Sequence, residues 1–332
     1  IEVRSPNPEI TEFSYGMLEP GESFSKELVM PGMPGTNSGI LEVSVVPPVD
    51  FGRRLKFLIR YPHGCIEQTT SAAFPQLYLA DVMESNENLN KVTSDNIKAA
   101  ITRISKFALP SGGFGYWPNS TLENEWGSCY AGHFLLQARE KAYSVPDRLL
   151  KNWVRYERKT ARRWTGNKYR SEWHKKSLEL TQAYRLYLLA LAGEPEIGAM
   201  NRLKERTNLN TTTRWKLAAA YALAGQPEVA KEIIRNLSTQ PGIYSGINYT
   251  YGSPVRDAAM VLETLTLLNQ KEKAIPVMLM ISENLSSNRW YSTQTTAYSL
   301  MAVAKYLGLN TAKEIRCEFS FGNQNMQKLA AN

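Results

Sequence analysis

Cysteine and histidine are scarce in this chain, with three residues of each among 332. Three cysteines are too few for a disulfide scaffold, and Cys65, Cys129 and Cys317 form no paired Cys-x-x-Cys metal site. Long apolar runs are also missing, since no stretch of roughly eighteen apolar residues occurs. We therefore expect no bound metal, no cofactor and no membrane-spanning helix.

The overall composition is that of a folded domain. Hydrophobic residues make up 43% of the chain, charged residues 21% and aromatic residues 10%. These proportions exclude bulk disorder and supply apolar side chains for one large core or two ordinary ones. The chain begins at Ile1 without a charged and then apolar leader, and we expect it to be a processed or excised piece.

Positive charge is concentrated in residues 151–176. Ten Lys and Arg residues lie there against Glu157 and Glu172, so the segment carries +8, equal to the net charge of the whole chain. Such a surface can bind nucleic acid. Because no nucleic-acid motif accompanies it, we expect a solvated helix face or a seat for an acidic neighbouring domain, and no nucleic-acid partner.

Both ends of the chain have the alternating pattern of β-strands. Residues 24–30 and 41–46 alternate near the N-terminus, where Pro47 and Pro48 end the second run. Residues 315–321 alternate in the same way near the C-terminus, with Ile, Cys and Phe at every second position. We expect these end segments to pair in a single sheet.

The middle of the chain has the period of helices, and no alternation of strands and helices suggests a parallel-sheet enzyme fold. The sequence therefore predicts a mainly α chain of three parts. Residues 1–46 and 311–332 belong to one β domain, and residues 47–310 form a helical domain inserted into it.

An internal repeat indicates how the helices are arranged. Residues 191–196, Leu-Ala-Gly-Glu-Pro-Glu, recur as residues 223–228, Leu-Ala-Gly-Gln-Pro-Glu. In each copy Gly suits the left-handed cap of one helix, and Pro suits the start of the next. Repeated helical hairpins of this kind indicate an α-solenoid or a closed α/α toroid, with tetratricopeptide repeats as a second choice.

The segment around Cys65 contains the most specific chemistry. Gly64 breaks the chain before Cys65, and Cys65 and Gln68 are three residues apart at the start of a predicted helix, on one face. A thiol at a helix N-terminus is expected to have a lowered pKa. It could attack the Gln68 amide, expel ammonia and leave an internal thioester. The alternative is a buried structural cysteine.

Five segments, taken together, resemble the thioester domain of the α2-macroglobulin and complement family in its bacterial form. They are residues 61–71, 112–118, 126–139, 251–257 and 290–296. The resemblance implies an α/α toroid of about six helical hairpins inserted into a CUB-like β domain, which agrees with the strand patterns at both ends.

The resemblance also implies a function. In this family a protease cuts a bait region elsewhere, the thioester is exposed, and lysine amines of the protease attack the Gln68 acyl group. The protein would be a broad-spectrum endopeptidase inhibitor with a single-use thioester, and not a turnover enzyme. Its partners would be target proteases and neighbouring macroglobulin-like domains, and its location would be the periplasm or cell envelope, possibly with a lipid anchor. No bait region is recognisable here.

A thioester must be kept dry until it is triggered. We expect an aromatic shield around it, although ordinary core packing is the alternative for each residue. The candidates are Tyr61, Phe114, Tyr116, Trp117 and Trp126. Glu67 is a possible supporting residue, which could orient the Gln68 amide or assist proton transfer, or simply hold the turn.

Histidine positions bear on the choice of nucleophile. No His lies between Gly112 and Trp126, where the complement branch has one, so direct attack by amines is expected. For His63 a packed or solvated ring is the expectation, and a proton shuttle is the alternative. We expect His133 to be a core residue and His174 to be exposed.

Two other functions remain as alternatives. An α/α-toroid glycoside hydrolase would need two carboxylates facing each other across a cleft, and Glu123 and Glu125 are candidates without a distinctive spacing. A non-covalent helical-repeat scaffold would use Cys65 only for packing.

Overall fold

The chain divides into two compact units in the structure, a computed structural model. One unit is Ile1–Pro48 together with Ala312–Asn332, and the other is Val49–Thr311. The structure describes residues 18, 21–29, 32–39, 41, 43, 54, 55, 58, 64–81, 87–167, 169–242, 249–287, 289–310, 315–321 and 325–331.

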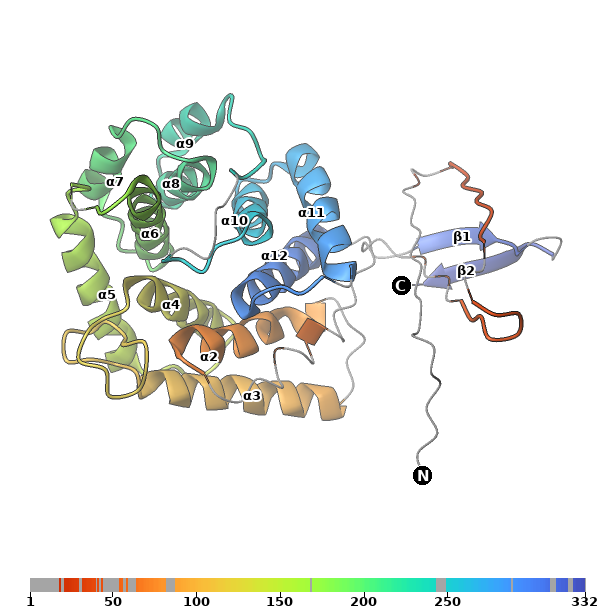
Figure 1. Cartoon of the computed structure of the whole chain (residues 1–332), viewed down its shortest axis with the longest axis horizontal. Coiled ribbons are helices and arrows are strands. Elements are labelled where there is room, and N and C mark those ends of the chain that lie inside the picture. Colours follow the sequence, from red (N-terminus) through yellow and green to blue (C-terminus); the bar gives the residue numbers. More distant parts are fainter. Residues whose placement is uncertain are drawn as a thin grey trace. The chain divides into compact units, whose positions relative to one another are not determined.

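Six of the described helices form an inner ring in the second unit (Figure 1). They are α2 (Ile66–Ala73), α4 (Glu125–Glu140), α6 (Glu172–Leu191), α8 (Thr211–Leu223), α10 (Pro254–Leu267) and α12 (Thr293–Asn310). Each packs against the next, and α12 packs back against α2, so the ring is closed. In α10, ten consecutive residues from Arg256 to Leu265 are buried, as expected for a helix enclosed on all sides.

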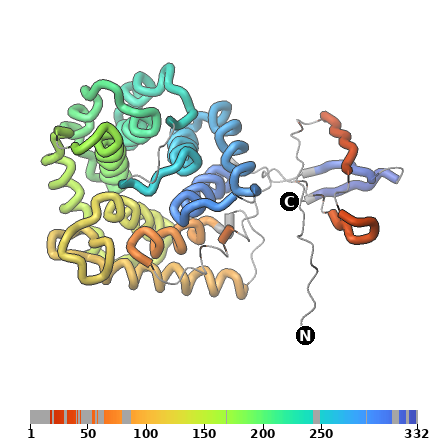
Figure 2. The backbone as a smooth tube through the Cα atoms, viewed as in Figure 1, coloured from red at the N-terminus to blue at the C-terminus, as the bar shows by residue number. Residues whose placement is uncertain are grey.

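The remaining described helices lie outside this ring and connect consecutive inner helices (Figure 2). They are α3 (Glu87–Ser105), α5 (Asp147–Arg163), α7 (Ile197–Lys204), α9 (Pro227–Ile234) and α11 (Lys271–Ser286). A 3-10 helix, η1 (Phe74–Asp81), continues α2 and packs against α12. This architecture is an α/α toroid, and the prediction of the fold is confirmed.

The internal repeat marks two corners of the toroid. Gly193 follows α6 with φ 77°, and Gly225 follows α8 with φ 74°, the left-handed conformation that the sequence predicts for each helix end. Pro227 is the first residue of α9, whereas Pro195 lies two residues before α7 begins.

A buried carboxylate, Glu263 of α10, binds side chains from four other inner helices. Its partners are His133 Nε2 at 3.3 Å, Tyr187 Oη at 3.2 Å, Lys216 Nζ, Tyr298 Oη at 2.6 Å and Lys305 Nζ at 3.7 Å. These come from α4, α6, α8 and, twice, α12. Burial alone would raise the pKa of Glu263, but the charges of Lys216 and its neighbours prevail and hold that pKa well below its ordinary value.

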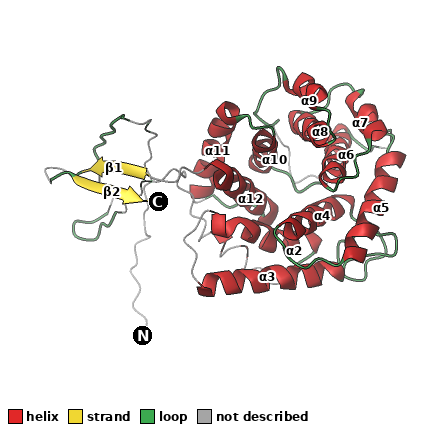
Figure 3. Ribbon diagram, turned by 180° about the vertical axis from the view of Figure 1, so that it is seen from behind, coloured by secondary structure: helices red, strands yellow, loops and turns green. Residues whose placement is uncertain are grey.

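The first unit contains a two-stranded antiparallel sheet in its described part (Figure 3). Strand β1 (Ile315–Phe319) pairs with β2 (Gln327–Ala331), with Cys317 opposite Leu329. The alternation at the C-terminal end therefore did predict a strand.

The prediction of a strand at residues 24–30 was wrong for the residues that the structure describes. Residues 24–29 are described and form no strand, and among the described residues β1 pairs with β2. An alternating pattern gives a strand only where a partner supplies ladder hydrogen bonds, and the alternation alone does not identify that partner. Most of residues 41–46 lie outside the described residues.

We predict that Gly132→Ala destabilises the toroid. A Cβ at Gly132 of α4 would overlap the indole of Trp153 in α5, so the two helices would have to separate. Overpacking of this kind costs about 1–3 kcal/mol of unfolding free energy. Gly198→Ala in α7 is the matched control, because its nearest neighbour would be the tip of Arg202 at 4.0 Å. Urea unfolding should show a loss for the first and no loss for the second.

The buried cluster around Glu263 also predicts acid sensitivity. Burial lowers the pKa of His133 from its ordinary 6.5, and the pKa of Glu263 is lowered as well. Below pH 6.5 the unfolded chain then binds more protons than the folded chain, so stability falls with falling pH. The urea midpoint should decrease between pH 7 and pH 5. The decrease nearest to pH 6.5 should be absent in His133→Gln, and an equal decrease in that variant would contradict the assignment to His133.

Candidate functional site

Cys65 lies at the N-cap position of α2 and its side chain is 2% exposed. All five other inner helices begin with a side chain that accepts a backbone N–H bond, namely Asn124, Ser171, Asn210, Ser253 and Ser292. Cys65 occupies the equivalent position but makes no such capping bond. Cys65 therefore differs from the N-cap residues of the other inner helices, whose side-chain oxygens accept a backbone hydrogen bond.

The spacing of Cys65 and Gln68 is that of a capping box. In this motif the N-cap side chain turns toward the third helical residue, and the side chain of that residue reaches back toward the N-cap. With Cys65 as N-cap, Gln68 is the third helical residue of α2. The helix start thus places a thiol and a carboxamide at the two positions that a capping box brings together.

Gly64 allows the chain to fold closely over this first turn. A Cβ at Gly64 would lie 2.9 Å from both the Gln68 Cβ and the Thr69 backbone nitrogen. Arg103 of α3 holds the same turn, since it donates to the Gly64 carbonyl at 3.2 Å and to Thr69 Oγ1 at 3.3 Å. Glycine at position 64 is a steric requirement of this conformation.

The loop that precedes α4 is hydrogen-bonded to the start of α2. The Ile66 N–H donates to the Tyr116 carbonyl oxygen at 3.0 Å, which satisfies one of the free N–H groups of the helix end. A Cβ at Gly127 in α4 would lie 2.6 Å from Ile66 Cγ2, so α4 also approaches α2 closely. The loop and the two helices form one packed unit around Cys65.

Burial dominates the electrostatics of Cys65. Desolvation raises the pKa of the Cys65 thiol, and the Glu67 carboxylate raises it further, while the Tyr116 hydroxyl and the Gln68 N–H lower it. The expectation of a lowered pKa at the helix N-terminus was therefore wrong, because the loss of water outweighs the helix end. The thiol is protonated at neutral pH in this structure.

Glu67 joins the two ends of the ring. Its carboxylate accepts bonds from Ser71 Oγ at 2.7 Å and from Thr293 Oγ1, the first residue of α12, at 2.9 Å. Burial raises the pKa of Glu67, and the two hydroxyls lower it in part. Of the roles considered for Glu67, these contacts favour a structural one, holding α2 against α12.

The aromatic candidates occupy different surroundings. The Tyr116 carbonyl accepts the Ile66 N–H bond beside Cys65, and the Tyr116 ring stacks on Tyr251 with centroids 6.2 Å apart. Trp117 packs its ring against Tyr116 at 5.4 Å but is 51% exposed. Phe114 and Trp126 are buried, and the Arg256 guanidinium lies 4.7 Å above the Trp126 ring. Their shielding role stays a prediction.

Two residues of the motif, Tyr61 and His63, lie outside the described residues. His133 is fully buried and bonds Tyr184 Oη at 2.8 Å, which confirms a core histidine. His174 is half-buried against Tyr249, with ring centroids 4.6 Å apart, and the expectation of an exposed ring was wrong because that aromatic neighbour covers it.

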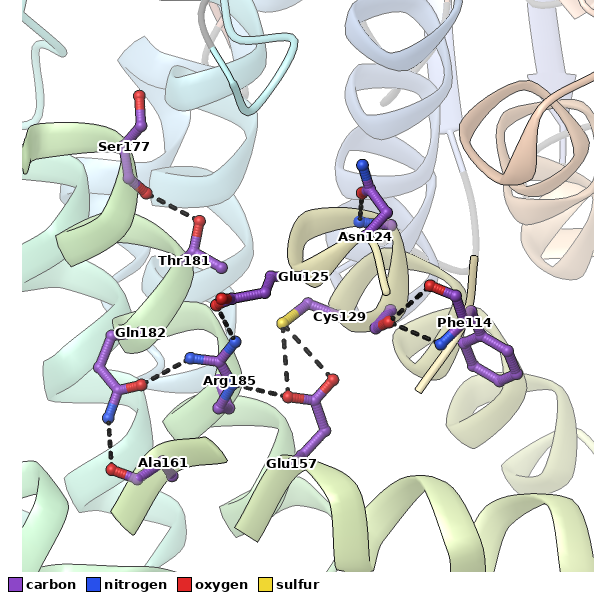
Figure 4. Close-up of polar contacts among 12 residues, drawn as sticks. Phe114, Asn124, Glu125, Cys129, Glu157, Ala161, Ser177, Thr181, Gln182 and Arg185 are labelled. Carbon is purple, nitrogen blue, oxygen red and sulfur yellow. Dashed lines mark hydrogen bonds and ion pairs between the residues drawn. The ribbon is translucent and has the colours of Figure 1, made fainter. Parts of the chain in front are cut away.

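The two carboxylates considered for a glycoside hydrolase, Glu125 and Glu123, each bind a different partner. Glu125 bonds the buried Arg185, which also binds Glu157 beside Cys129 (Figure 4). Cys129 is fully buried, and burial raises its pKa well above the ordinary value, as expected for a structural thiol. Glu123 instead accepts a hydrogen bond from Ser111, which lowers its pKa. The pair gives no support to a glycoside hydrolase.

The basic segment is partly neutralised by the turn that follows α6. Arg158 and Arg162 both bond Glu196 at 2.8 Å, and Arg158 also bonds Glu194. The arginine ends of this face are at least a third exposed. The structure therefore has an ion-paired surface helix here, in agreement with the prediction of a solvated helix face.

Sequence reasoning did not identify three residues of the site. Arg103 and Thr293 hold the first turn of α2, and Tyr251 stacks on Tyr116. Tyr251 and Thr293 stand in segments that were recognised by resemblance, but no local pattern assigns them a contact. Arg103 lies on an ordinary amphipathic helix, where nothing distinguishes it.

Metal sites and membrane spans are two further features that bear on function. Groups of three or more His, Cys, Asp or Glu side chains that could hold a metal ion are absent among them. No helix in the described part of the chain is long and apolar enough to cross a membrane.

Comparisons with known proteins identify the helical unit. Residues 43–166 match the family model described as the A-macroglobulin TED domain. The α2-macroglobulin of Escherichia coli K12 is 26% identical over 96% of this chain and 20% of its own length. A crystal structure of Salmonella α2-macroglobulin reacted with methylamine covers 87% of this chain and 19% of its own, with 25% identity and a TM-score of 0.73.

A crystal structure of native E. coli α2-macroglobulin, from domain MG7 to the C-terminus, gives a TM-score of 0.70 at 24% identity over 87% of this chain and 47% of its own. This chain spans about one fifth of the length of the curated relatives it matches. The toroid, the motif at the start of α2 and the matches agree: residues 43–166 match a TED domain, and the chain is similar over nearly its whole length to bacterial α2-macroglobulins.

Proposed function

We propose that Cys65 and Gln68 form an internal thioester and that this chain is the covalently reactive part of a protease-trapping protein. The observation that carries the proposal is the start of α2, where a buried thiol and a carboxamide occupy the two positions of a capping box behind Gly64. The similarity of the chain to bacterial α2-macroglobulins supports it.

The formation of the bond balances within the motif. The Cys65 sulfur bonds to the Gln68 side-chain carbonyl carbon, and the carbon–nitrogen bond breaks. The thiol proton leaves with the nitrogen as ammonia. An amine then attacks the same carbon, expels the Cys65 sulfur and becomes an amide of residue 68, so each chain reacts once.

The surface around the helix starts supports a cover supplied by a neighbouring domain. Large apolar side chains are exposed close before three inner helices: Trp117 (51%) and Leu122 (76%) before α4, Tyr249 (61%) before α10 and Trp290 (74%) before α12. Successive inner helices of a toroid run in the same direction, so these starts lie at the end where Cys65 lies. Exposed large apolar side chains at one end of a domain are a feature of docking surfaces.

The expected attackers are lysine amines on a captured protease, after cleavage of a bait region in another part of the protein. The Salmonella protein was crystallised after reaction with methylamine, and the E. coli protein has been solved in a trypsin-activated form. These relatives support an amine-reactive site in this chain. A CUB-like nature for the first unit and a periplasmic or cell-envelope location stay predictions from the resemblance.

We predict that Cys65→Ala abolishes covalent uptake of methylamine. The intact mass of the unchanged chain should be lower than its sequence by one ammonia, and methylamine should convert it to the methylamide with release of one thiol. Cys317→Ser in β1 is the matched control and should behave like the unchanged chain. A Cys65→Ala chain that still incorporates methylamine would exclude Cys65, and an unchanged chain that keeps its full amide mass from the moment of folding would favour the non-covalent scaffold.

We also predict that Gly64→Ala impairs thioester formation while the toroid remains folded. The added Cβ would collide with Gln68 and the Thr69 nitrogen, at a cost of about 1–3 kcal/mol to that turn. The fraction of chains that lose ammonia should fall several-fold, with circular dichroism unchanged. Gly242→Ala is the control, since no atom lies within 4 Å of its Cβ position. Equal thioester content in both variants would show that the close approach at Gly64 is unimportant.

A further inference from the structure

Helix α2 lacks the side-chain cap that closes the start of the other five inner helices. It is also short, eight residues, and a helix of that length is marginal on its own. Because Cys65 occupies the cap position without a capping bond, contacts from elsewhere in the fold have to hold the first turn. Those contacts decide whether Cys65 and Gln68 stay in place.

Two of these contacts hold the backbone, at Gly64 and Ile66. The third holds a side chain. Thr293, the first residue of α12, donates its hydroxyl to the Glu67 carboxylate, at 2.9 Å from Oε1 and 3.1 Å from Oε2. Helix α12 packs against α2 in the ring (Figure 1). The contact therefore ties the first turn of α2 to the helix that closes the ring.

The Glu67 carboxylate depends on this hydroxyl. Glu67 is 5% exposed, and its two hydrogen-bond donors in the described part of the chain are the hydroxyls of Ser71 and Thr293. Ser71 belongs to α2 itself, so Thr293 is the donor that anchors the carboxylate on another helix. A buried carboxylate that loses one of two donors is strongly disfavoured where it stands and turns toward water or other donors.

Glu67 stands between Cys65 and Gln68 in the chain. An anchor on its side chain therefore fixes the rotation of the turn that carries the thiol and the carboxamide. For the sulfur to attack the Gln68 carbonyl carbon, the two atoms have to be held about 3–3.5 Å apart, and a displacement of about 1 Å can slow such a reaction roughly 100-fold. The anchor can control the reaction without touching either reacting atom.

We propose that Thr293 is a positioning residue for the reaction of Cys65 with Gln68, and that it acts through Glu67. In that step the sulfur–carbon bond forms, the carbon–nitrogen bond of the amide breaks, and the thiol proton leaves with the nitrogen as ammonia. Thr293 neither gives nor takes a proton, and its hydroxyl keeps the first turn of α2 against α12 while the step occurs. This inference rests on the proposed thioester.

A second threonine provides a matched control. Thr212, in the first turn of α8, donates its hydroxyl to the buried carboxylate of Asp257 in α10 at 3.0 Å. This contact is of the same kind, from a threonine at the start of one inner helix to a carboxylate near the start of another, but it joins α8 to α10 and not α12 to α2. A general loss of stability would act at both sites, whereas a loss of positioning would act only at Thr293.

The test removes the Thr293 hydroxyl in two ways, by Thr293→Val, which keeps the branched shape, and by Thr293→Ala, which adds no bulk. Thr293→Ser keeps a hydroxyl, and Thr212→Val is the control. Each chain is refolded and sampled by intact mass from the first moment, so that the loss of ammonia is followed in time. Urea unfolding of the same chains records the stability that each change costs.

We expect Thr293→Val and Thr293→Ala to slow the loss of ammonia roughly 10- to 100-fold, with Thr293→Ser and Thr212→Val close to the unchanged chain. In a Glu67→Ala chain, adding Thr293→Val should cause no further slowing, because Thr293 acts through Glu67. An unchanged rate in Thr293→Val, equal slowing in Thr212→Val, or additive slowing with Glu67→Ala would each overturn the proposal.

A second measurement does not need the thioester. In a Gln68→Ala, Cys317→Ser chain the remaining thiols are Cys65 and Cys129, and Cys129 is fully buried in α4. Labelling of Cys65 by a soluble thiol reagent then reports how often the first turn of α2 opens. Thr293→Val should speed this labelling roughly 10-fold, and the control variant should not. If the unchanged chain never loses ammonia, the proposed function fails, and the labelling rate still decides whether Thr293 holds the turn.

Discussion

The toroid depends on one buried carboxylate. Glu263 binds partners from α4, α6, α8 and α12, so five of the six inner helices meet at a single charged group. A charge without water must be fully paired, and the loss of one partner leaves the rest uncompensated. Apolar faces pack with little directional preference, whereas His133 and Lys216 contact Glu263 at defined atoms. The cluster therefore favours the observed register of the ring.

Closure of the ring in turn positions the reactive motif. Helix α2 is short, eight residues, and its place is fixed by its neighbours on both sides. Glu67 ties it to Thr293 of α12, and Ile66 is fastened to the Tyr116 carbonyl and packed on Gly127 of α4. Since α12 and α4 belong to the last and second hairpins, the geometry at Cys65 exists only once the whole ring has formed.

Local pattern was sufficient for some features and not for others. The cap at Gly193, the strand at Ile315–Phe319 and the helical hairpins follow from short-range sequence rules, and the structure has them. The raised pKa of Cys65 did not follow, because burial is decided by distant segments. The contact of Tyr251 with Tyr116 joins residues 135 positions apart, 251 minus 116, and no periodicity encodes it. The same limit explains the N-terminal strand that failed to form.

The N-cap residues of the inner helices show how little separates the proposed thioester motif from an ordinary helix start. Ser171 and Ser253 close their helices with an oxygen at the place where Cys65 has a sulfur. The N-cap position that holds Cys65 is thus a common helix start, repeated around the ring, and among these helices α2 has a glutamine as its third residue. Replacing the side-chain oxygen of such a serine with sulfur, opposite a glutamine, would convert a stabilising cap into the pair that forms the proposed thioester. Beyond this ordinary helix start, the proposed thioester requires only the sulfur, the glutamine and a burial deep enough to keep water away.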